Sequence, residues 1–156
     1  MGVTNLQLKR FQSEHYAEYL AWFADEELNR RLGPMAETDE PWLAAVLAET
    51  GSDAATWAVF RGDEMVAVVE AAYDPEIAAW AAITAIATKP GLRRQGIGEA
   101  VLRRVLSLHQ QRGITEHVAY VKLDNEAARC CIEKVGFAAV TGEPNEQGYV
   151  AFRHIQ

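Results

Sequence analysis

The chain has little cysteine, and the cysteines it has are badly placed for a disulfide or a metal site. Its 156 residues include two cysteines, Cys130 and Cys131, which are adjacent in sequence. Neighbours on a helix point about 100° apart, so a disulfide between them would be strained. Two thiols without partners at ligand spacing do not indicate zinc either, and the four histidines are scattered. We therefore predict no metal and interpret both thiols as small apolar side chains.

Long apolar runs are also missing from the sequence. No segment approaches the roughly 18 consecutive apolar residues that a membrane-spanning helix needs. The first ten residues carry no basic segment followed by an apolar core, which is the pattern of a secretory signal. We therefore expect a cytoplasmic protein without a membrane partner.

Basic residues are outnumbered, with 15 Lys and Arg against 22 Asp and Glu, for a net charge of −7. General nucleic-acid binders are normally basic, so we expect no nucleic-acid partner. The charge suits a cationic partner such as an amine, although solubility alone explains the charge of most acidic proteins. The length fits one domain over residues 1–156, and both a monomer and a homodimer remain open.

Apolar periodicity predicts an α+β fold, with about four helices packed on a mixed sheet of about seven strands. The segment 77–88 is ambiguous because its alanines suit a helix, but its β-branched residues and the breaker at Pro90 favour a strand. The first helix places Tyr16, Leu20 and Phe23 at helical spacing. The expected strands are 6–10, 56–61, 64–73, 77–88, 117–121, 138–141 and 149–155. The expected helices are 14–24, 38–50, 96–112 and 125–135.

One segment carries a chemical signal: a strand ends at Thr88, a basic loop with glycines follows, and a strong helix begins. The N–H groups of a helix start have no partner within the helix, and they bind phosphates readily. Gly96 and Gly98 let a ligand approach the backbone, while Arg93 and Arg94 add positive charge. A tight loop with solvated arginines explains the segment about as well. It is neither a Walker loop nor a dinucleotide fingerprint.

Two stretches together resemble a known family. Residues 93–98, Arg-Arg-Gln-Gly-Ile-Gly, resemble the Arg-x-x-Gly-x-Gly/Ala signature of the GNAT family of N-acetyltransferases. Residues 125–128, Asn-Glu-Ala-Ala, and 133–137, Glu-Lys-Val-Gly-Phe, resemble that family's second helix. The matched stretches have the family's order and separation and extend over residues 83–137. Residues 19–30 also resemble the ribosomal-protein alanine acetyltransferase branch.

The resemblance implies acetyl-CoA as cofactor and a mostly antiparallel sheet that splays between its fourth and fifth strands. Backbone N–H groups of residues 95–100 would hold the pyrophosphate, and the strand edge at 86–88 would bond the pantetheine arm. Asn125 would face that arm, although a helix N-cap is an equally natural role for it. The implied cofactor residues are Ile86, Ala87, Thr88, Arg93, Arg94, Gln95, Gly96, Ile97, Gly98, Glu99, Ala100, Asn125, Ala128, Cys131 and Lys134.

The implied reaction is direct acetyl transfer to an amine, which is mostly protonated at pH 7 and needs a base. Family members often place a Glu in the central strand and a Tyr on the second helix. These positions are Ala82 and Ile132 here. The candidate catalytic residues are therefore Glu70, Thr84 and Tyr120, although a solvent-facing structural carboxylate explains Glu70 at least as well.

The acceptor amine stays open among small amines, aminoglycoside-like molecules and peptide N-termini. In the resembling branch two N-terminal helices wall the acceptor site, which makes Glu26, Asn29 and Trp42 candidate contacts. A solvated helix end and a core Trp are equally plausible there. Asp74 is a further candidate for contact or for the base. Two other functions remain open: a CoA-binding regulatory module without catalysis, and a phosphate-loop protein for another nucleotide.

Overall fold

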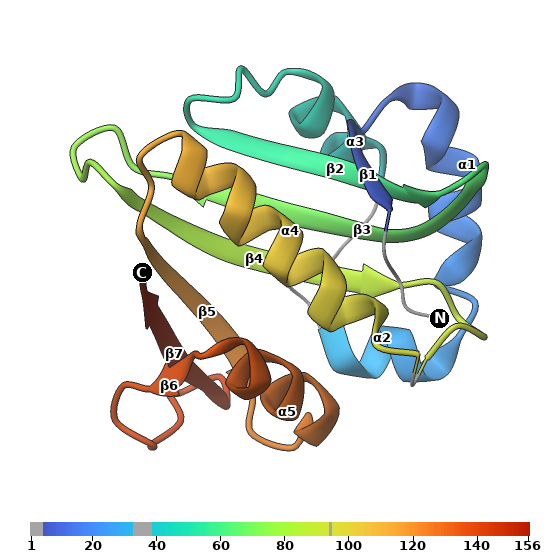
Figure 1. Ribbon diagram of the computed structural model, residues 1–156. Helices are drawn as coiled ribbons and strands as arrows, with labels where there is room; N and C mark the ends of the chain where they lie inside the picture. Colours follow the sequence, from blue (N-terminus) through green and yellow to red (C-terminus); the bar gives the residue numbers. More distant parts are fainter. Residues whose placement is uncertain (1–4, 33–38, 94) are drawn as a thin grey trace.

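The computed structural model of the chain describes residues 5–32, 39–93 and 95–156, with only the backbone at 29, 31 and 32. Within these ranges, seven strands form one sheet in the order β1-β2-β3-β4-β5-β7-β6 (Figure 1). The strands are β1 (Leu6–Arg10), β2 (Ala54–Arg61), β3 (Glu64–Tyr73), β4 (Trp80–Thr88), β5 (Glu116–Lys122), β6 (Ala138–Ala139) and β7 (Tyr149–Ile155). The helices are α1 (Ser13–Trp22), α2 (Glu26–Leu32), α3 (Glu40–Leu47), α4 (Ile97–Gln111) and α5 (Glu126–Val135).

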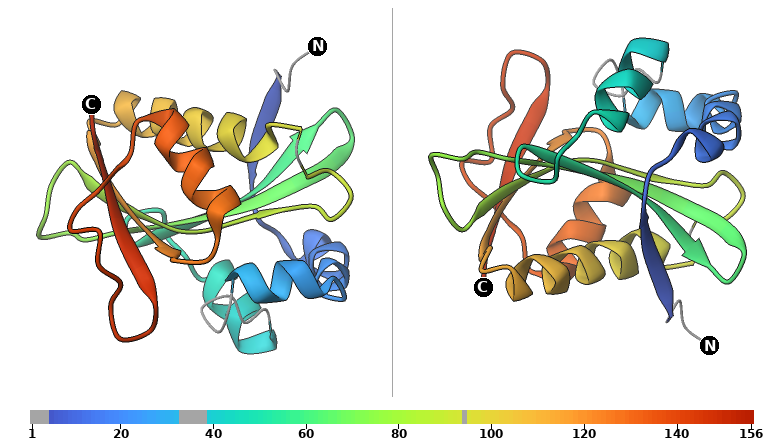
Figure 2. Two further views of the ribbon diagram at one scale, coloured as in Figure 1. Left: turned by 90° about the horizontal axis from the view of Figure 1, so that it is seen from below. Right: turned by 90° about the horizontal axis from the view of Figure 1, so that it is seen from above.

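The helices cover both faces of the sheet. Figure 2 shows α4 and α5 on one face and α1, α2 and α3 on the other. Successive strand side chains point to opposite faces, so each strand feeds two cores. On β3, for example, Val69 packs with the α4 and α5 side chains, while Val68 packs with those of α1, α2 and α3.

The expected elements are present, with differences at their ends and one added helix. The added helix is α2, which begins just after α1. Asp25 caps it, because its side chain accepts a hydrogen bond from Leu28 N at 2.9 Å. The first strand of the final hairpin, β6, is shorter than expected, because it is only two residues long. The predicted helix start at residue 38 lies outside the described residues.

The predicted apolar stripe of the first helix is only partly right. Tyr19 and Trp22 are its buried residues, at 0% and 5% exposure, whereas Leu20 is 46% exposed. The helix therefore packs on the sheet with a face one residue away from the one that the spacing indicated. The shift brings the Tyr19 ring, instead of Leu20, into the core beneath α1.

Strands β4 and β5 separate after a short parallel contact. All other neighbours in the sheet are antiparallel, and this pair is joined only from Trp80 to Ile83, opposite Glu116 to Ala119. On the other side of β4 the register slips, with Glu70 opposite Ala85 and Ala71 opposite Ile83. Thr84 is thus the extra residue of a β-bulge. These findings confirm the expected mixed, mostly antiparallel sheet and its splay.

A chain of buried polar groups joins β3, α4 and β5. The Tyr73 hydroxyl shares a hydrogen bond of 2.7 Å with His109 Nε2, and His109 Nδ1 shares one of 2.8 Å with His117 Nε2. Both histidines are fully buried. Burial lowers the pKa of each ring to about 4, with further lowering from His117 at the first and from His154 at the second. Both rings are therefore neutral at neutral pH.

This histidine pair makes stability depend on pH. The native pKa lies below the unfolded value, so the unfolded chain binds more protons between about pH 4 and 6.5. Stability from the pair is present above that window and is lost as the pH falls through it. We expect each histidine to lower the unfolding free energy by about 2 kcal/mol, and the pair by about 4 kcal/mol, on going from about pH 7 to pH 5.

Urea unfolding at several pH values measures this effect. The variant His117→Gln keeps an amide at the position of Nε2 but cannot titrate, so it should reduce the slope of stability against pH, of which His109 still supplies a part. His15→Gln, outside the pair, is the control and should keep the slope of the original chain. Glu70, whose raised pKa acts with the opposite sign, is common to all three chains and cancels in the comparison. Equal slopes for all three chains would contradict the assignment.

Candidate active site

The turn between β4 and α4 leaves the first N–H groups of a helix without a side-chain cap. Helices α2, α3 and α5 begin at Asp25, Asp39 and Asn125, whose side chains each accept a backbone N–H. Helix α4 instead begins at Gly96, with φ of 76° and no side-chain cap. A Cβ built at Gly96 would meet nothing within 4 Å. This turn therefore offers both unused donors and space to an anion.

Of the other residues of this turn, some are buried in the core and some are exposed. Ile97 is 1% exposed and fixes the helix start in the core, while Gln95 is exposed. Ala100 N donates to Gly96 O at 3.1 Å as the first regular bond of α4. Glu99 is paired with Arg103 at 3.1 Å, one turn along the helix.

Arg93 does not point freely into solvent. Its guanidinium forms an ion pair with Asp25, the residue that caps α2. The loop before α4 is thereby tied to the N-terminal helices. Arg94, the other expected cation, lies outside the described residues.

Helix α5 packs closely beside the first turn of α4. A Cβ at Gly98 would lie 3.5 Å from Cys131 Sγ. Burial raises the pKa of the Cys131 thiol, and the charge of Glu99 raises it further, so the thiol is neutral and acts as a packing group. Lys134 contributes its carbonyl oxygen, which accepts a bond of 3.1 Å from Arg103 Nη2.

Asn125 has the capping role that was one of its two expected functions. Its side-chain oxygen accepts from Ala128 N at 3.1 Å at the start of α5. Asn125 and Ala128 are both half-buried. They lie just after β5, on the far side of the gap from β4.

The edge of β4 that faces β5 is open beyond Ile83. On its β3 side, Ile86, Ala87 and Thr88 are opposite Val69, Val68 and Ala67. On the other side no strand residue is paired with them in the described part of the chain. Figure 1 shows β4 and β5 diverging there, with α4 beginning near the wide end of the gap. The three residues expected at this edge are therefore placed along it.

Glu70, Thr84 and Tyr120 lie on three strands, β3, β4 and β5, near the point where β4 and β5 separate. Thr84 Oγ1 donates to Glu70 O at 3.2 Å across the bulge. Tyr120 follows Ala119, the last β5 residue paired with β4, and it is 53% exposed. By strand alternation, Glu70 and Tyr120 both face the side of the sheet that α1 and α3 cover. Three separate strands thus each supply one polar residue near the end of the parallel ladder.

Glu70 is not a solvent-facing structural carboxylate. Trp42 of α3 lies over it and donates from Nε1 to Glu70 Oε1 at 3.3 Å. Burial raises the pKa of Glu70 to about 7, the hydrogen bond from Trp42 acts in the opposite direction, and Glu49 raises it again. A carboxyl group with a pKa near neutrality is suited to exchange protons at physiological pH.

The expected acceptor contacts are not all brought to this place. Glu26 is exposed at the first turn of α2, and the Asn29 side chain lies outside the described residues. Asp74 accepts from Glu76 N at 2.9 Å in the turn after β3. That turn lies near Trp80, at the end of β4 where β4 and β5 are still joined. Asp74 is thus at the opposite end of the gap from the start of α4.

One neighbour of the site was missed from the sequence. Tyr19 is fully buried near Glu70, whose charge, second to burial, raises the Tyr19 pKa. Its ring contacts that of Trp42, with centroids 5.5 Å apart. Tyr19 and Trp22 are also at helical spacing in α1, and that spacing is the signal for their burial. The sequence prediction instead used the spacing of Tyr16, Leu20 and Phe23.

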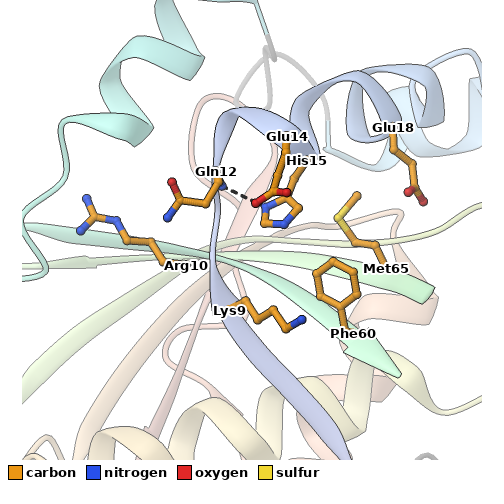
Figure 3. A pocket seen from close by; sticks show the side chains of 8 residues that line it. All are labelled: Lys9, Arg10, Gln12, Glu14, His15, Glu18, Phe60 and Met65. Carbon is orange, nitrogen blue, oxygen red and sulfur yellow. Dashed lines mark hydrogen bonds between the residues drawn. The ribbon is translucent and has the colours of Figure 1, made fainter. Parts of the chain in front are cut away.

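Two hollows of the described surface lie beside the gap. Figure 3 shows one of them, between β1 and α1, lined by Lys9 and Arg10 of β1 and by Glu14 and Glu18 of α1. Its volume is about 520 Å³. A second, of about 540 Å³, lies between the end of α1 and the Lys89-Pro90 turn. Both border the N-terminal helices and neither includes the open edge of β4.

Two kinds of feature are absent from the described residues. They contain no cluster of three or more His, Cys, Asp and Glu side chains arranged to hold a metal ion. They also contain no helix with the length and apolar character required to cross a bilayer.

Comparison with known proteins connects this geometry to a family. Residues 16–137 match the family described as the acetyltransferase (GNAT) family. A relative from Bacillus subtilis (strain 168), the uncharacterized N-acetyltransferase YfmK, is 26% identical over 138 residues, which are 83% of this chain and 82% of that protein.

Solved structures with the same fold include enzymes that differ in their acceptors. The aminoglycoside acetyltransferase AAC(6')-Ib in complex with ribostamycin and coenzyme A aligns with a TM-score of 0.79 at 16% identity, covering 97% of this chain and 93% of that one. The ribosomal-protein-S18-alanine N-acetyltransferase from Escherichia coli aligns with a TM-score of 0.69 at 18% identity, covering 96% and 93%. The family match covers most of the chain, and it agrees with the split sheet and the uncapped helix start: the chain belongs to the acetyltransferase (GNAT) family, whose acetyl donor is acetyl-CoA.

Proposed function

We propose that this chain transfers the acetyl group of acetyl-CoA directly to the nitrogen of a primary amine. The observation that carries the proposal is the separation of β4 from β5 beyond Ile83 and Ala119. The gap joins an uncapped helix start at one end to a mostly buried carboxyl group, Glu70, at the other. A donor laid along β4 would thus lead from an anion site to a proton acceptor.

The residues around the gap fit this donor. The backbone N–H groups at residues 95–99 would hold the pyrophosphate, because the first turn of α4 has no side-chain cap; the N–H of Ala100, also expected there, already donates to Gly96 O. The open edge at residues 86–88 would bond the amide groups of the pantetheine arm, as an added strand would. Asn125, Ala128, Cys131 and Lys134 would form the α5 side of the site. When bound, acetyl-CoA supplies an activated acetyl thioester.

Proton transfer at the amine is assigned to Glu70. An amine arrives mostly protonated at neutral pH and must lose a proton to become a nucleophile. A carboxylate with a pKa near 7 accepts that proton more readily than an ordinary glutamate. Thr84 is engaged with Glu70 O and holds the bulge, while Tyr120 is an exposed hydroxyl on the opposite strand.

The acceptor is proposed to be a cationic amine that approaches from the side of α1, α2 and α3. The net charge of −7 and the exposed Glu26 support this choice. The structural neighbours act on aminoglycosides and on a ribosomal protein, so both classes belong in a screen with small amines. Measuring thiol release from acetyl-CoA with each amine tests the proposal.

A non-catalytic CoA-binding module is the second candidate function. It is favoured by Ala82 and by Ile132, which is 5% exposed and packed in the core where a proton donor is often found in the family. Tight acetyl-CoA binding without turnover of any amine would support this second function. Turnover with one amine class would exclude it.

Gly96 provides a test of the cofactor turn. Gly96→Val forces a β-branched residue into the left-handed conformation at φ of 76°, so the turn must reshape. We expect acetyl-CoA affinity, measured by calorimetry, to fall by at least about tenfold. Gly113→Val is the matched control, because Gly113 has φ of 82° and open space but lies at the other end of α4. Similar affinity losses in both variants, or none in a folded Gly96→Val, would contradict the assignment.

Glu70 provides a test of the chemistry. Glu70→Gln should lower kcat at neutral pH by roughly a hundredfold, since an amide cannot accept the proton, while the Kd for acetyl-CoA stays unchanged. In the original chain, kcat/KM should fall as the pH drops below about 7, where the carboxylate becomes protonated. Glu76→Gln, on the exposed turn after β3, is the control and should behave as the original chain. An unchanged rate in Glu70→Gln would clear Glu70 of this role.

A further inference from the structure

The hydrogen bond between Trp42 and Glu70 connects a helix of the outer layer to the centre of the sheet. Trp42 lies on α3, and Glu70 lies 28 residues later on β3. Among the described residues, the Trp42 indole is the only side chain that donates a hydrogen bond to the Glu70 carboxylate. An indole nitrogen can donate but not accept, so this contact stabilises the ionised carboxylate more than its protonated form.

The indole is held in place from several sides. Its ring lies 5.3 Å from that of Phe11, 5.5 Å from that of Tyr19 and 6.4 Å from that of Tyr16, measured between centroids. The backbone is fixed as well, because Asp39 Oδ1 accepts from Trp42 N at 3.0 Å at the start of α3. The side chain is therefore oriented before any substrate arrives, and its one polar atom is already used by Glu70.

We propose that Trp42 is a positioning residue for acetyl transfer, which holds the Glu70 carboxylate toward the place where β4 and β5 separate. This inference rests on the proposed role of Glu70 as the proton acceptor. It also changes the expected role of Trp42, from a contact to the amine into a support for the group that deprotonates the amine.

Other groups face Glu70 and define its charge balance. Tyr19 of α1 is buried, its hydroxyl has no hydrogen-bond partner among the described residues, and its raised pKa keeps it neutral. Glu49, which follows α3, raises the pKa of Glu70 by repulsion, and it is itself offset by Arg10 of β1. Thr56 lies opposite Glu70 on β2 and bonds Glu49 instead, at 3.0 Å. The Trp42 bond thus opposes burial and Glu49 together.

Removing the indole N–H while keeping an aromatic ring tests the proposal. In Trp42→Phe, the acidic limb of the kcat/KM profile for the amine should move to higher pH by about 0.5–1 unit. The rate near pH 6 should fall by about threefold to tenfold, and the difference should narrow above about pH 8.5, where Glu70 is ionised in both chains. The Kd for acetyl-CoA should not change.

Trp57→Phe is the matched control, because it makes the same substitution on the opposite face of the sheet. Trp57 packs against the core beneath α4, where its ring lies 5.9 Å from that of His109. Its pH profile should match that of the original chain. If Trp42→Phe still transfers acetyl groups and the acidic limb of its pH profile does not move, the inference about Trp42 is overturned and the proposed function stands. Absence of transfer in the original chain would overturn the proposed function.

A measurement on the original chain covers the case in which Trp42→Phe fails to fold. With nitrogen-15 in the tryptophans, the Trp42 indole proton resonance should shift with pH along the same midpoint as the Glu70 carboxyl carbon in a carbon-13 titration. In Glu70→Gln the indole resonance should stay constant over that range. An indole resonance that ignores the Glu70 midpoint in the original chain would also overturn the inference.

Discussion

The hydrogen bonds between β4 and β5 stop after Ile83 and Ala119, and the site depends on where they stop. A longer parallel ladder would fill the edge of β4 with strand partners and leave no backbone groups for a ligand. The bulge at Thr84 falls one residue beyond the last pair, where extra twist turns the strand away from its neighbour. Helix α4 then begins across the opening, and α5 borders the other side.

The chemistry of the site follows from two opposing influences on one carboxyl group. Burial beneath α3 and repulsion from Glu49 favour the protonated form of Glu70, while the indole of Trp42 favours the ionised form. Their balance leaves the pKa of Glu70 close to 7, so the carboxyl group can both take up and release protons at physiological pH. The α1, α2 and α3 layer therefore affects the chemistry and does more than shield the sheet from water.

The sequence predicted the sheet and the helix start after β4 better than the surroundings of Glu70. The start of α4 at Gly96 is local, so glycine positions and helix periodicity were sufficient to predict that helix start, while its cofactor role came from the family resemblance. The burial of Glu70 depends on α3 folding over β3, and no pattern within either segment indicates that contact. Asp74 differs from Glu70. It follows β3, the strand that carries Glu70, but the direction of β3 places it at the end of the gap where β4 and β5 are still paired. The face of α1 was misjudged because its aromatic residues occur on more than one side.

The carboxylate of Asp25 serves two segments at once, since it caps α2 and also pairs with Arg93. An anion that engages Arg93 changes the charge that the start of α2 experiences, and α2 carries the exposed Glu26. In the proposed function, acetyl-CoA at the start of α4 and an amine beside α2 would therefore share one carboxylate, and such thermodynamic linkage acts equally in both directions. Occupancy of the one site and affinity at the other would then depend on each other through this counter-ion, without any movement of the sheet.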